Sequence, residues 1–183
     1  MTDVSNLLLL CLDVQPVFLK AMAHGERLQR RCSFSVQAAA GLGIATVFTE
    51  QVPQKLGGTA PELLALAPQR TVLAKSTFSA LADDTIREAI LGRKTEHLLL
   101  CGLETPVCVY QTAVDALATG LHVTLLSDAI DARRPDDAAT CLSSLRHAGA
   151  HVLPSETVFY ALLHDTGHPF FKAYIQLVKN AGL

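Results

Sequence analysis

The chain has 183 residues, of which 50% are hydrophobic and 17% charged, and its formal net charge is −2. This length suits one domain with a substantial core, so we predict a single domain over residues 1–183. The sequence has no run of basic residues, which argues against a nucleic-acid partner. The first apolar run, Leu7 to Leu12, is too short to span a membrane and closes at Asp13, so no membrane partner is expected.

The predicted elements alternate along the chain between continuous apolar runs and helical patterns. This alternation is typical of a parallel sheet covered by helices on both faces. The predicted strands lie near residues 6–12, 44–49, 71–75, 97–101, 121–126 and 151–153. The predicted helices lie near residues 27–41, 61–66, 84–92, 106–119, 136–148, 155–164 and 168–179. Between them, the segment from Val52 to Pro61 is the longest predicted loop and a candidate cover for a site.

The five cysteines are an odd number and lie mostly in apolar contexts. This pattern indicates reduced thiols rather than a disulfide framework, and we therefore expect a cytoplasmic protein. Four of the five are interpreted as small buried hydrophobic residues: Cys11, Cys32, Cys101 and Cys141.

The fifth cysteine, Cys108, lies where a helix follows a buried strand. Thr105 is predicted as the N-cap and Pro106 as the first helical residue, which makes Cys108 the third. The first turn of a helix carries partial positive charge and unpaired N–H groups, which suit both a thiolate and an oxyanion. A helix end contributes only about 0.3–1 kcal/mol, however, so a nucleophilic cysteine needs further charged groups nearby.

Two charged residues end other predicted strands. Asp13 follows the first strand and Lys75 ends the third, so both are expected at the carboxyl edge of the sheet with Cys108. An aspartate there can accept the thiol proton, and a lysine can hold the aspartate ionised. The two charges act on the thiol in opposite directions, which leaves the direction of its pKa shift open. Taken alone, Asp13 could instead cap a turn and Lys75 could be a surface residue.

Three segments carry a resemblance to the isochorismatase-like cysteine hydrolases, in particular to the metal-free isochorismatase domain-containing branch. They run from Leu12 to Phe18, from Lys75 to Leu81 and from Gly102 to Ala113. The resemblance extends over nearly the whole chain. It implies a three-layer α/β (αβα) fold with a six-stranded parallel sheet of order 3-2-1-4-5-6.

The same resemblance implies the roles of the site residues. Asp13, Lys75 and Cys108 would form a catalytic triad that attacks a carbonyl carbon through a thioester-type intermediate. The peptide between Leu103 and Glu104 would be cis, and the backbone amides of Glu104 and Cys108 would form the oxyanion hole. Pro106 departs from the polar residue of many relatives, and this removes a polar group from the rim of the pocket.

Seven further residues are candidates for contact with a substrate. We expect the pocket to be lined by Gln15, Phe18, Phe78, Thr105 and Val107, although core packing is an equally good interpretation of the two phenylalanines. Arg133 and Arg134 follow the fifth strand and could contact an anionic substrate, but a solvated loop or a subunit contact is the favoured interpretation.

No cofactor and no metal are expected. The nicotinamidase branch of the resembled family follows its second strand with an Asp-x-His set. Here Thr49 is followed by Glu50-Gln51-Val52-Pro53, and no histidine lies between His24 and His97. An ordinary set of three or four nitrogen and oxygen ligands cannot be assembled from these residues.

The sequence therefore predicts a metal-independent cysteine hydrolase that acts on a small amide or related carbonyl compound. A different hydrolytic specificity within the resembled family, including a nuclease-like one, is the enzymatic alternative, and a binding or scaffold protein with little turnover is the alternative from another class. We also expect a homo-oligomer, a dimer or tetramer, because the last helix offers Phe170, Phe171, Tyr174, Ile175 and Val178 as apolar surface. The alternative is that this helix docks on the sheet of its own chain.

Overall fold

The computed structural model describes residues 4–182, so residues 1–3 and 183 of the predicted domain lie outside the described residues. A six-stranded sheet of order β3-β2-β1-β4-β5-β6 forms its centre, and neighbouring strands pair in parallel. The strands are β1 Leu7–Leu12, β2 Ala45–Gln51, β3 Thr71–Lys75, β4 His97–Gly102, β5 His122–Ile130 and β6 His151–Leu153. The predicted α/β class, the parallel sheet and the strand order are confirmed.

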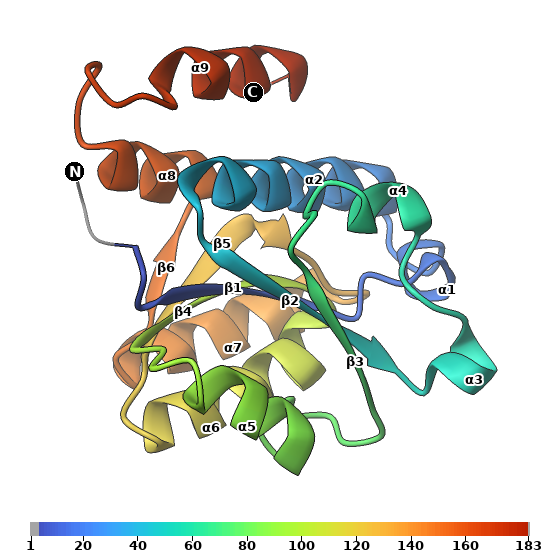
Figure 1. Ribbon diagram of the computed structural model, residues 1–183. Helices are drawn as coiled ribbons and strands as arrows, with labels where there is room; N and C mark the ends of the chain where they lie inside the picture. The colour runs from blue at the N-terminus through green and yellow to red at the C-terminus, as the bar shows by residue number, and fades with distance from the viewer. Residues whose placement is uncertain (1–3, 183) are drawn as a thin grey trace.

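Helices cover both faces of the sheet (Figure 1). On one face lie α2 (Gly25–Leu42) and α8 (Ser155–Leu163). The other face is covered by α5 (Asp84–Leu91), α6 (Tyr110–Ala118) and α7 (Pro135–His147). Four shorter elements, α1 Pro16–Leu19, α3 Pro53–Leu56, α4 Pro61–Leu64 and the π-helical turn η1 Thr105–Val109, complete the set with α9 Phe171–Asn180.

Strand β1 shows why the sheet needs helices on both faces. Its side chains alternate, as in any strand. Leu9 and Cys11 join the apolar cluster under α2, while Leu8, Leu10 and Leu12 join the cluster on the opposite face. All five are buried. A strand that is buried on both faces reads as an uninterrupted apolar run, which is the pattern seen in the sequence.

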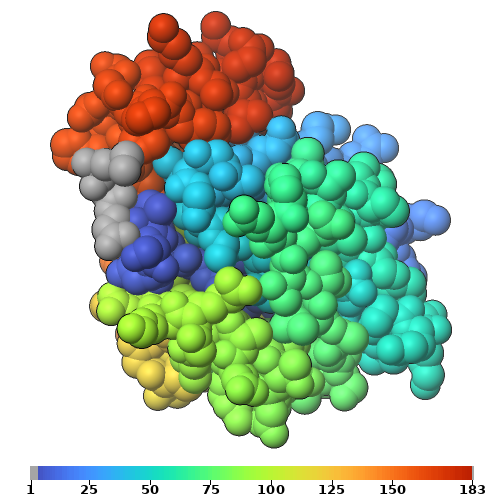
Figure 2. Space-filling view, in the orientation of Figure 1, coloured from blue at the N-terminus to red at the C-terminus, as the bar shows by residue number. Residues whose placement is uncertain are grey.

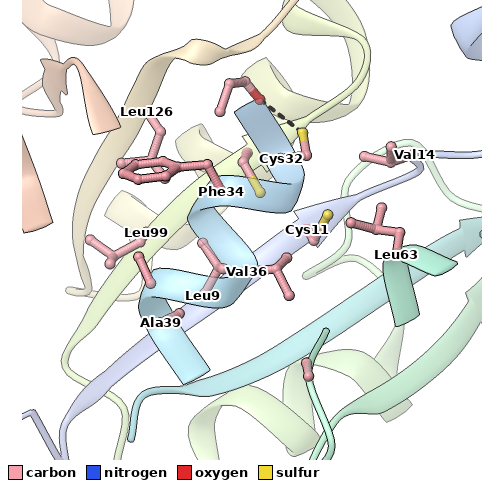
Figure 3. Packing of buried hydrophobic residues seen from close by; sticks show 14 of the residues in the cluster. Leu9, Cys11, Val14, Cys32, Phe34, Val36, Ala39, Leu63, Leu99 and Leu126 are labelled. Carbon is pink, nitrogen blue, oxygen red and sulfur yellow. Dashed lines mark hydrogen bonds between the residues drawn. The ribbon is translucent and has the colours of Figure 1, made fainter. Parts of the chain in front are cut away.

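The cluster under α2 is drawn in Figure 3. The α2 residues Cys32, Phe34 and Val36 lie in this cluster with Leu9 of β1 and Leu99 of β4, and the Cys32 thiol donates to the Ala129 carbonyl at 3.4 Å. These side chains are at most 1% exposed. Burial of this much apolar surface is the main source of stability for such a layer.

The predicted elements agree with the observed ones, with two short helices missed. Both α1 and α3 begin with a proline at the first helical position, and α3 lies within the predicted long loop. Four-residue helices bury too little apolar surface to produce a periodic pattern, which is why the sequence did not indicate them. Among residues 4–182, no helix combines the length and the apolar character needed to cross a bilayer.

The apolar face of α9 is used within the chain. Tyr174 is fully buried, and Phe170, Phe171 and Val178 pack against the cluster under α2. Figure 1 shows α9 lying outside α2 and α8, and in Figure 2 the C-terminal segment forms a ridge beside α2. These four residues therefore do not form the free apolar surface that the sequence led us to expect.

Gly102, the last residue of β4, is held in a conformation that needs glycine. Its φ is +112°, and a Cβ there would lie 2.0 Å from the carbonyl oxygen of Leu12 in β1. The Leu103 N–H donates to that same oxygen at 2.8 Å. The backbone of β4 thus approaches β1 closely at the point where the chain turns toward Glu104 and Cys108.

We expect Gly102→Ala to reduce the free energy of unfolding by more than about 3 kcal/mol, since the added Cβ forces the two strands apart. Gly120→Ala is the matched control. Its φ is +85°, but nothing lies within 4 Å of an added Cβ, so only the backbone strain of about 1 kcal/mol applies. Urea unfolding of both variants measures the difference, and equal losses would contradict the close approach.

Candidate active site

Three side chains from distant parts of the sequence meet at the carboxyl edge of the sheet. Asp13 follows β1, Lys75 ends β3, and Cys108 lies in η1 after β4. The Lys75 Nζ donates to Asp13 Oδ2 at 2.7 Å and lies 3.7 Å from the Cys108 Sγ. The Asp13 carboxylate is also near enough to Cys108 to raise the pKa of its thiol. The predicted triad residues are therefore brought together.

Asp13 is held by its neighbours on both sides. Thr49 of β2 donates its hydroxyl to Asp13 Oδ1 at 2.7 Å, while the Asp13 N–H donates to the Thr49 carbonyl at 3.1 Å. The backbone of Asp13 has a φ of +52°, a left-handed conformation that aspartate tolerates better than most residues. Both carboxylate oxygens are thus occupied, and the side chain has a fixed orientation.

Lys75 is a fully buried ammonium group that is surrounded by oxygen acceptors. Besides Asp13, it donates to Gln51 Oε1 at 2.5 Å and to the backbone carbonyls of Thr77 and Phe78 at 3.2 and 3.3 Å. A buried charge needs such partners to offset the loss of water. The roles of Thr49 and Gln51 were not predicted from the sequence. Both are polar residues in a buried strand, and this pattern could have indicated that they bind other polar groups.

Cys108 lies on a π-helical turn rather than in the first turn of a regular α-helix. Glu104 is the N-cap residue of η1, so the predicted N-cap is corrected. The Thr105 hydroxyl instead donates to the Asp131 carbonyl at 2.9 Å, and the Thr105 N–H donates to the same oxygen at 2.9 Å. Because that oxygen lies in the segment after β5, tertiary contact decides the cap rather than local sequence.

Burial raises the pKa of the Cys108 thiol to about 12, and the negative charge of Asp13 acts in the same direction. Lys75 and a backbone hydrogen bond from Glu104 lower the pKa, but they do not compensate. The sequence left the direction of this shift open, and the upward direction favours a neutral thiol over a thiolate in the resting site.

The peptide between Leu103 and Glu104 is cis. The backbone of Glu104 is hydrogen-bonded to Cys108. The Glu104 amide therefore lies beside the sulfur, on the segment that leads into η1.

A cavity of about 260 Å³ opens above the Cys108 sulfur. Phe18, Phe78 and Val107 line it, as predicted. Gln15 and Thr105 do not, because both are buried and bonded elsewhere: Gln15 exchanges hydrogen bonds with the backbone of Gln51 and also donates to the carbonyl of Gly57. The remaining lining residues are Asp13, Ala21, Met22, Gln51, Leu103, Glu104, Cys108 and Arg133.

The predicted loop from Val52 to Pro61 contributes none of these lining residues. Its contacts near the site are with the backbone and with Gln15: the Val52 N–H donates to the Lys75 carbonyl at 2.9 Å, and the Gly57 carbonyl accepts a hydrogen bond from Gln15. The segment therefore braces Gln15, two residues after Asp13, and does not cover the cavity.

The two arginines after β5 have different surroundings. Arg133 lines the cavity and pairs with Glu104, with 3.0 Å between its Nη2 and Glu104 Oε2. Arg134 pairs with Asp137 and does not line the cavity. Of the two, Arg133 is the one that lies beside the cavity.

The last two residues of β2 have structural partners. Glu50 Oε1 accepts from the Thr59 N–H at 2.7 Å, and Gln51 binds Lys75. The absence of a metal at this position remains a prediction from the sequence.

Within the described part of the chain, one group of three possible metal ligands lies close together, with all sulfur atoms within 4.8 Å of one another. It consists of Cys11, Cys32 and Cys101, two of which are labelled in Figure 3. Interactions among the thiols, together with burial, raise the pKa of each well above its usual value. We interpret them as neutral thiols that pack in the core, as the sequence predicted.

Comparison with known proteins agrees with this geometry. A family model for the isochorismatase domain matches residues 7–157. The bovine (Bos taurus) isochorismatase domain-containing protein 2 is 36% identical over 177 residues, which cover 96% of this chain and 84% of that protein.

Two solved structures are similar over nearly the whole chain. The MAR1 ribonuclease of Caenorhabditis elegans has a TM-score of 0.90 at 29% identity, covering 97% of this chain and 92% of its own. YcaC of Escherichia coli, an octameric hydrolase of unknown specificity, has a TM-score of 0.91 at 20% identity, covering 98% and 90%. The latter similarity shows a shared fold. With a family match over most of its length and a relative above 30% identity, the chain belongs to the isochorismatase domain family.

Proposed function

We propose that this member of the family is a metal-independent cysteine hydrolase of small amides or related carbonyl compounds. The observation that carries the proposal is the buried contact of Lys75 with both Asp13 and Cys108, at 2.7 and 3.7 Å, beside a cavity. The side chains of the Lys75–Asp13 ion pair are at most 2% exposed. A buried ion pair adds little net stability, because the loss of water offsets the attraction between the charges. Its position next to a thiol supports a chemical role.

The first half-reaction needs a base because the resting thiol is neutral. Asp13 takes the proton from Cys108 as the sulfur attacks the carbonyl carbon. The carbonyl oxygen becomes an oxyanion, which the backbone N–H groups of Glu104 and Cys108 would stabilise. As the C–N bond breaks, the proton on Asp13 passes to the departing amine, and an acyl group remains bonded to the sulfur.

In the second half-reaction, a water molecule attacks the acyl carbon and gives its proton to Asp13. The C–S bond then breaks, the carboxylic acid leaves, and the proton returns to Cys108. Throughout the cycle, Lys75 holds Asp13 in position and balances the negative charge that moves between carboxylate and sulfur.

A scaffold protein with little turnover remains the alternative from another class. Nuclease activity, which is part of the name of the C. elegans relative, has less support here. The chain has a formal net charge of −2, and Arg133 and Arg134 are each paired with a carboxylate. A nucleic-acid site needs free cationic groups for phosphate.

We further propose a homo-oligomer in the cytoplasm. The octameric state of YcaC supports association in this fold, and the five free cysteines support a reducing compartment. Tyr160 of α8, 39% exposed beside Tyr174, is a remaining apolar contact residue.

Removing either the nucleophile or the base should abolish hydrolysis. On a panel of small primary amides and esters, we expect Cys108→Ala to lower kcat/KM by at least about 1,000-fold and Asp13→Asn by about 100- to 10,000-fold. Ammonia release measures turnover of the amides, acid release measures turnover of the esters, and mass spectrometry of quenched wild type detects the acyl group on Cys108. Cys141→Ala, which changes a partly exposed cysteine far from the triad in sequence, is the control. Unchanged turnover by Cys108→Ala would exclude the mechanism, and a panel without any turnover would favour the scaffold.

The alkylation of Cys108 should depend on pH in a way that separates the two charges. With a pKa of about 12, roughly one thiol in 100,000 is ionised at pH 7, so the iodoacetamide rate should rise about tenfold per pH unit from 7 to 9. Asp13→Asn removes a negative charge and should shift this profile to lower pH. Lys75→Ala removes a positive charge and should slow alkylation.

Peptide mapping assigns the label to Cys108 among the five cysteines. A rate that levels off near neutral pH in wild type would contradict the raised pKa. Faster alkylation of Asp13→Asn combined with lost hydrolysis would identify Asp13 as the base, because the variant then has more thiolate and still fails to turn over.

Light scattering at about 10 μM should give a mass of at least twice the 19.6 kDa of one chain. Tyr160→Lys places a charge on the exposed part of α8 and should lower that mass if this surface is buried between copies. A monomeric wild type would exclude the homo-oligomer.

A further inference from the structure

The cavity beside Cys108 is electrically balanced. Its charged lining residues are Asp13, Glu104 and Arg133. Asp13 is paired with Lys75, and Glu104 with Arg133. Each charge on the cavity wall therefore has a partner of opposite sign.

The Glu104–Arg133 pair is built as a unit. The Arg133 Nε donates to both carboxylate oxygens at 3.1 Å, and the backbone N–H of the same residue donates to Glu104 Oε1 at 3.1 Å. The Glu104 side chain is 16% exposed while that of Arg133 is 59% exposed. The carboxylate is thus the more deeply placed of the two groups.

Neighbouring backbone contacts hold the two residues in register. Thr105, next to Glu104, donates both its N–H and its hydroxyl to the carbonyl of Asp131, two residues before Arg133. The segments after β4 and β5 are therefore joined on both sides of the ion pair. A guanidinium held in this way by a fork-like contact is not free to turn toward a ligand.

The rest of the cavity wall is mainly apolar. The apolar lining residues are Phe18, Ala21, Met22, Phe78, Leu103 and Val107. The volume of about 260 Å³ lies just below the range of about 300–1,000 Å³ that is usual for pockets of drug-sized ligands. This shape and chemistry suit a small acyl group that makes van der Waals contacts.

We propose that the substrate carries a small, uncharged, apolar acyl group, and that Glu104 determines this preference by neutralising Arg133. The proposal rests on the proposed hydrolase function and specifies its substrate class. An anionic acyl group would lose its water in a cavity whose lining cation, Arg133, is already paired with Glu104 and so offers no unpaired positive charge in exchange. Exchange of Glu104 for glutamine keeps the size and the backbone amide but releases Arg133.

The test compares two amides of equal shape. In 5-methylhexanamide, an isopropyl group takes the place of the carboxylate of glutaramate (5-amino-5-oxopentanoate). We expect wild type to prefer the neutral amide by at least 100-fold in kcat/KM. Glu104→Gln should reduce this ratio at least tenfold, and the double variant Glu104→Gln with Arg133→Gln should restore it, because no cation then remains at the rim. A ratio is used because a general loss of rate cancels from it.

Asp137→Asn is the matched control. It releases Arg134, the adjacent arginine, which does not line the cavity, and should leave the ratio unchanged. A response equal to that of Glu104→Gln would attribute the effect to net charge and overturn the proposal. So would equal use of both amides by wild type, or a ratio unaffected by Glu104→Gln.

Protection of Cys108 from iodoacetamide measures the same preference without turnover. Selective protection by 5-methylhexanamide, lost in Glu104→Gln, would support the selectivity even if no amide is hydrolysed, and only the hydrolase function would then fail. Equal protection by both compounds in wild type would overturn the selectivity whatever the outcome for hydrolysis.

Discussion

The buried contact between Lys75 and Asp13 is the interaction on which the site depends. Their side chains are 0% and 2% exposed, and the two groups are 62 residues apart in sequence. The strand order brings them together, because β3 and β1 flank β2 and end at the same edge. Thr49 and Gln51 of β2 bridge the gap by donating to Asp13 and accepting from Lys75. Loss of one member would leave a buried charge without its partner, which is far more costly than loss of both.

This arrangement gives Asp13 two opposing effects on Cys108. Its charge, added to burial, raises the pKa of the thiol, while in the proposed mechanism its carboxylate accepts the thiol proton. A neutral thiol is protected from oxidation and random alkylation, which act on the thiolate. In the proposed mechanism, the sulfur becomes nucleophilic only when a carbonyl group is present to receive the electron pair.

The loops after β4 and β5 would connect the proposed catalysis to the proposed selectivity. The backbone of Glu104 lies beside the Cys108 sulfur, and its carboxylate forms an ion pair with Arg133. The close approach of Gly102 to Leu12 fixes where that segment leaves the sheet. One turn of chain thus sets both the proposed oxyanion donor and the charge balance of the cavity, which explains how the site can be precise although it lies on connecting segments.

The sequence by itself predicted all six strands, the longer helices and the three residues of the proposed triad. Apolar runs that end at Asp13 and Lys75 predict parallel strands, and the helix that follows Cys101 predicts the position of Cys108. Both predictions use only neighbouring residues, since the spacing of apolar residues and the signals that start or end a helix are local. The strand order was predicted from the family resemblance, because the residue pattern of a strand does not show which strands lie next to it in the sheet. Tertiary structure alone decided that Thr105 binds Asp131 instead of capping its helix, that Arg133 is neutralised by Glu104, and that the Cys108 pKa rises. Each of these depends on contacts across 26 or more residues or on burial. The energies of such contacts arise only when the chain has closed those loops, so no local window of sequence contains them.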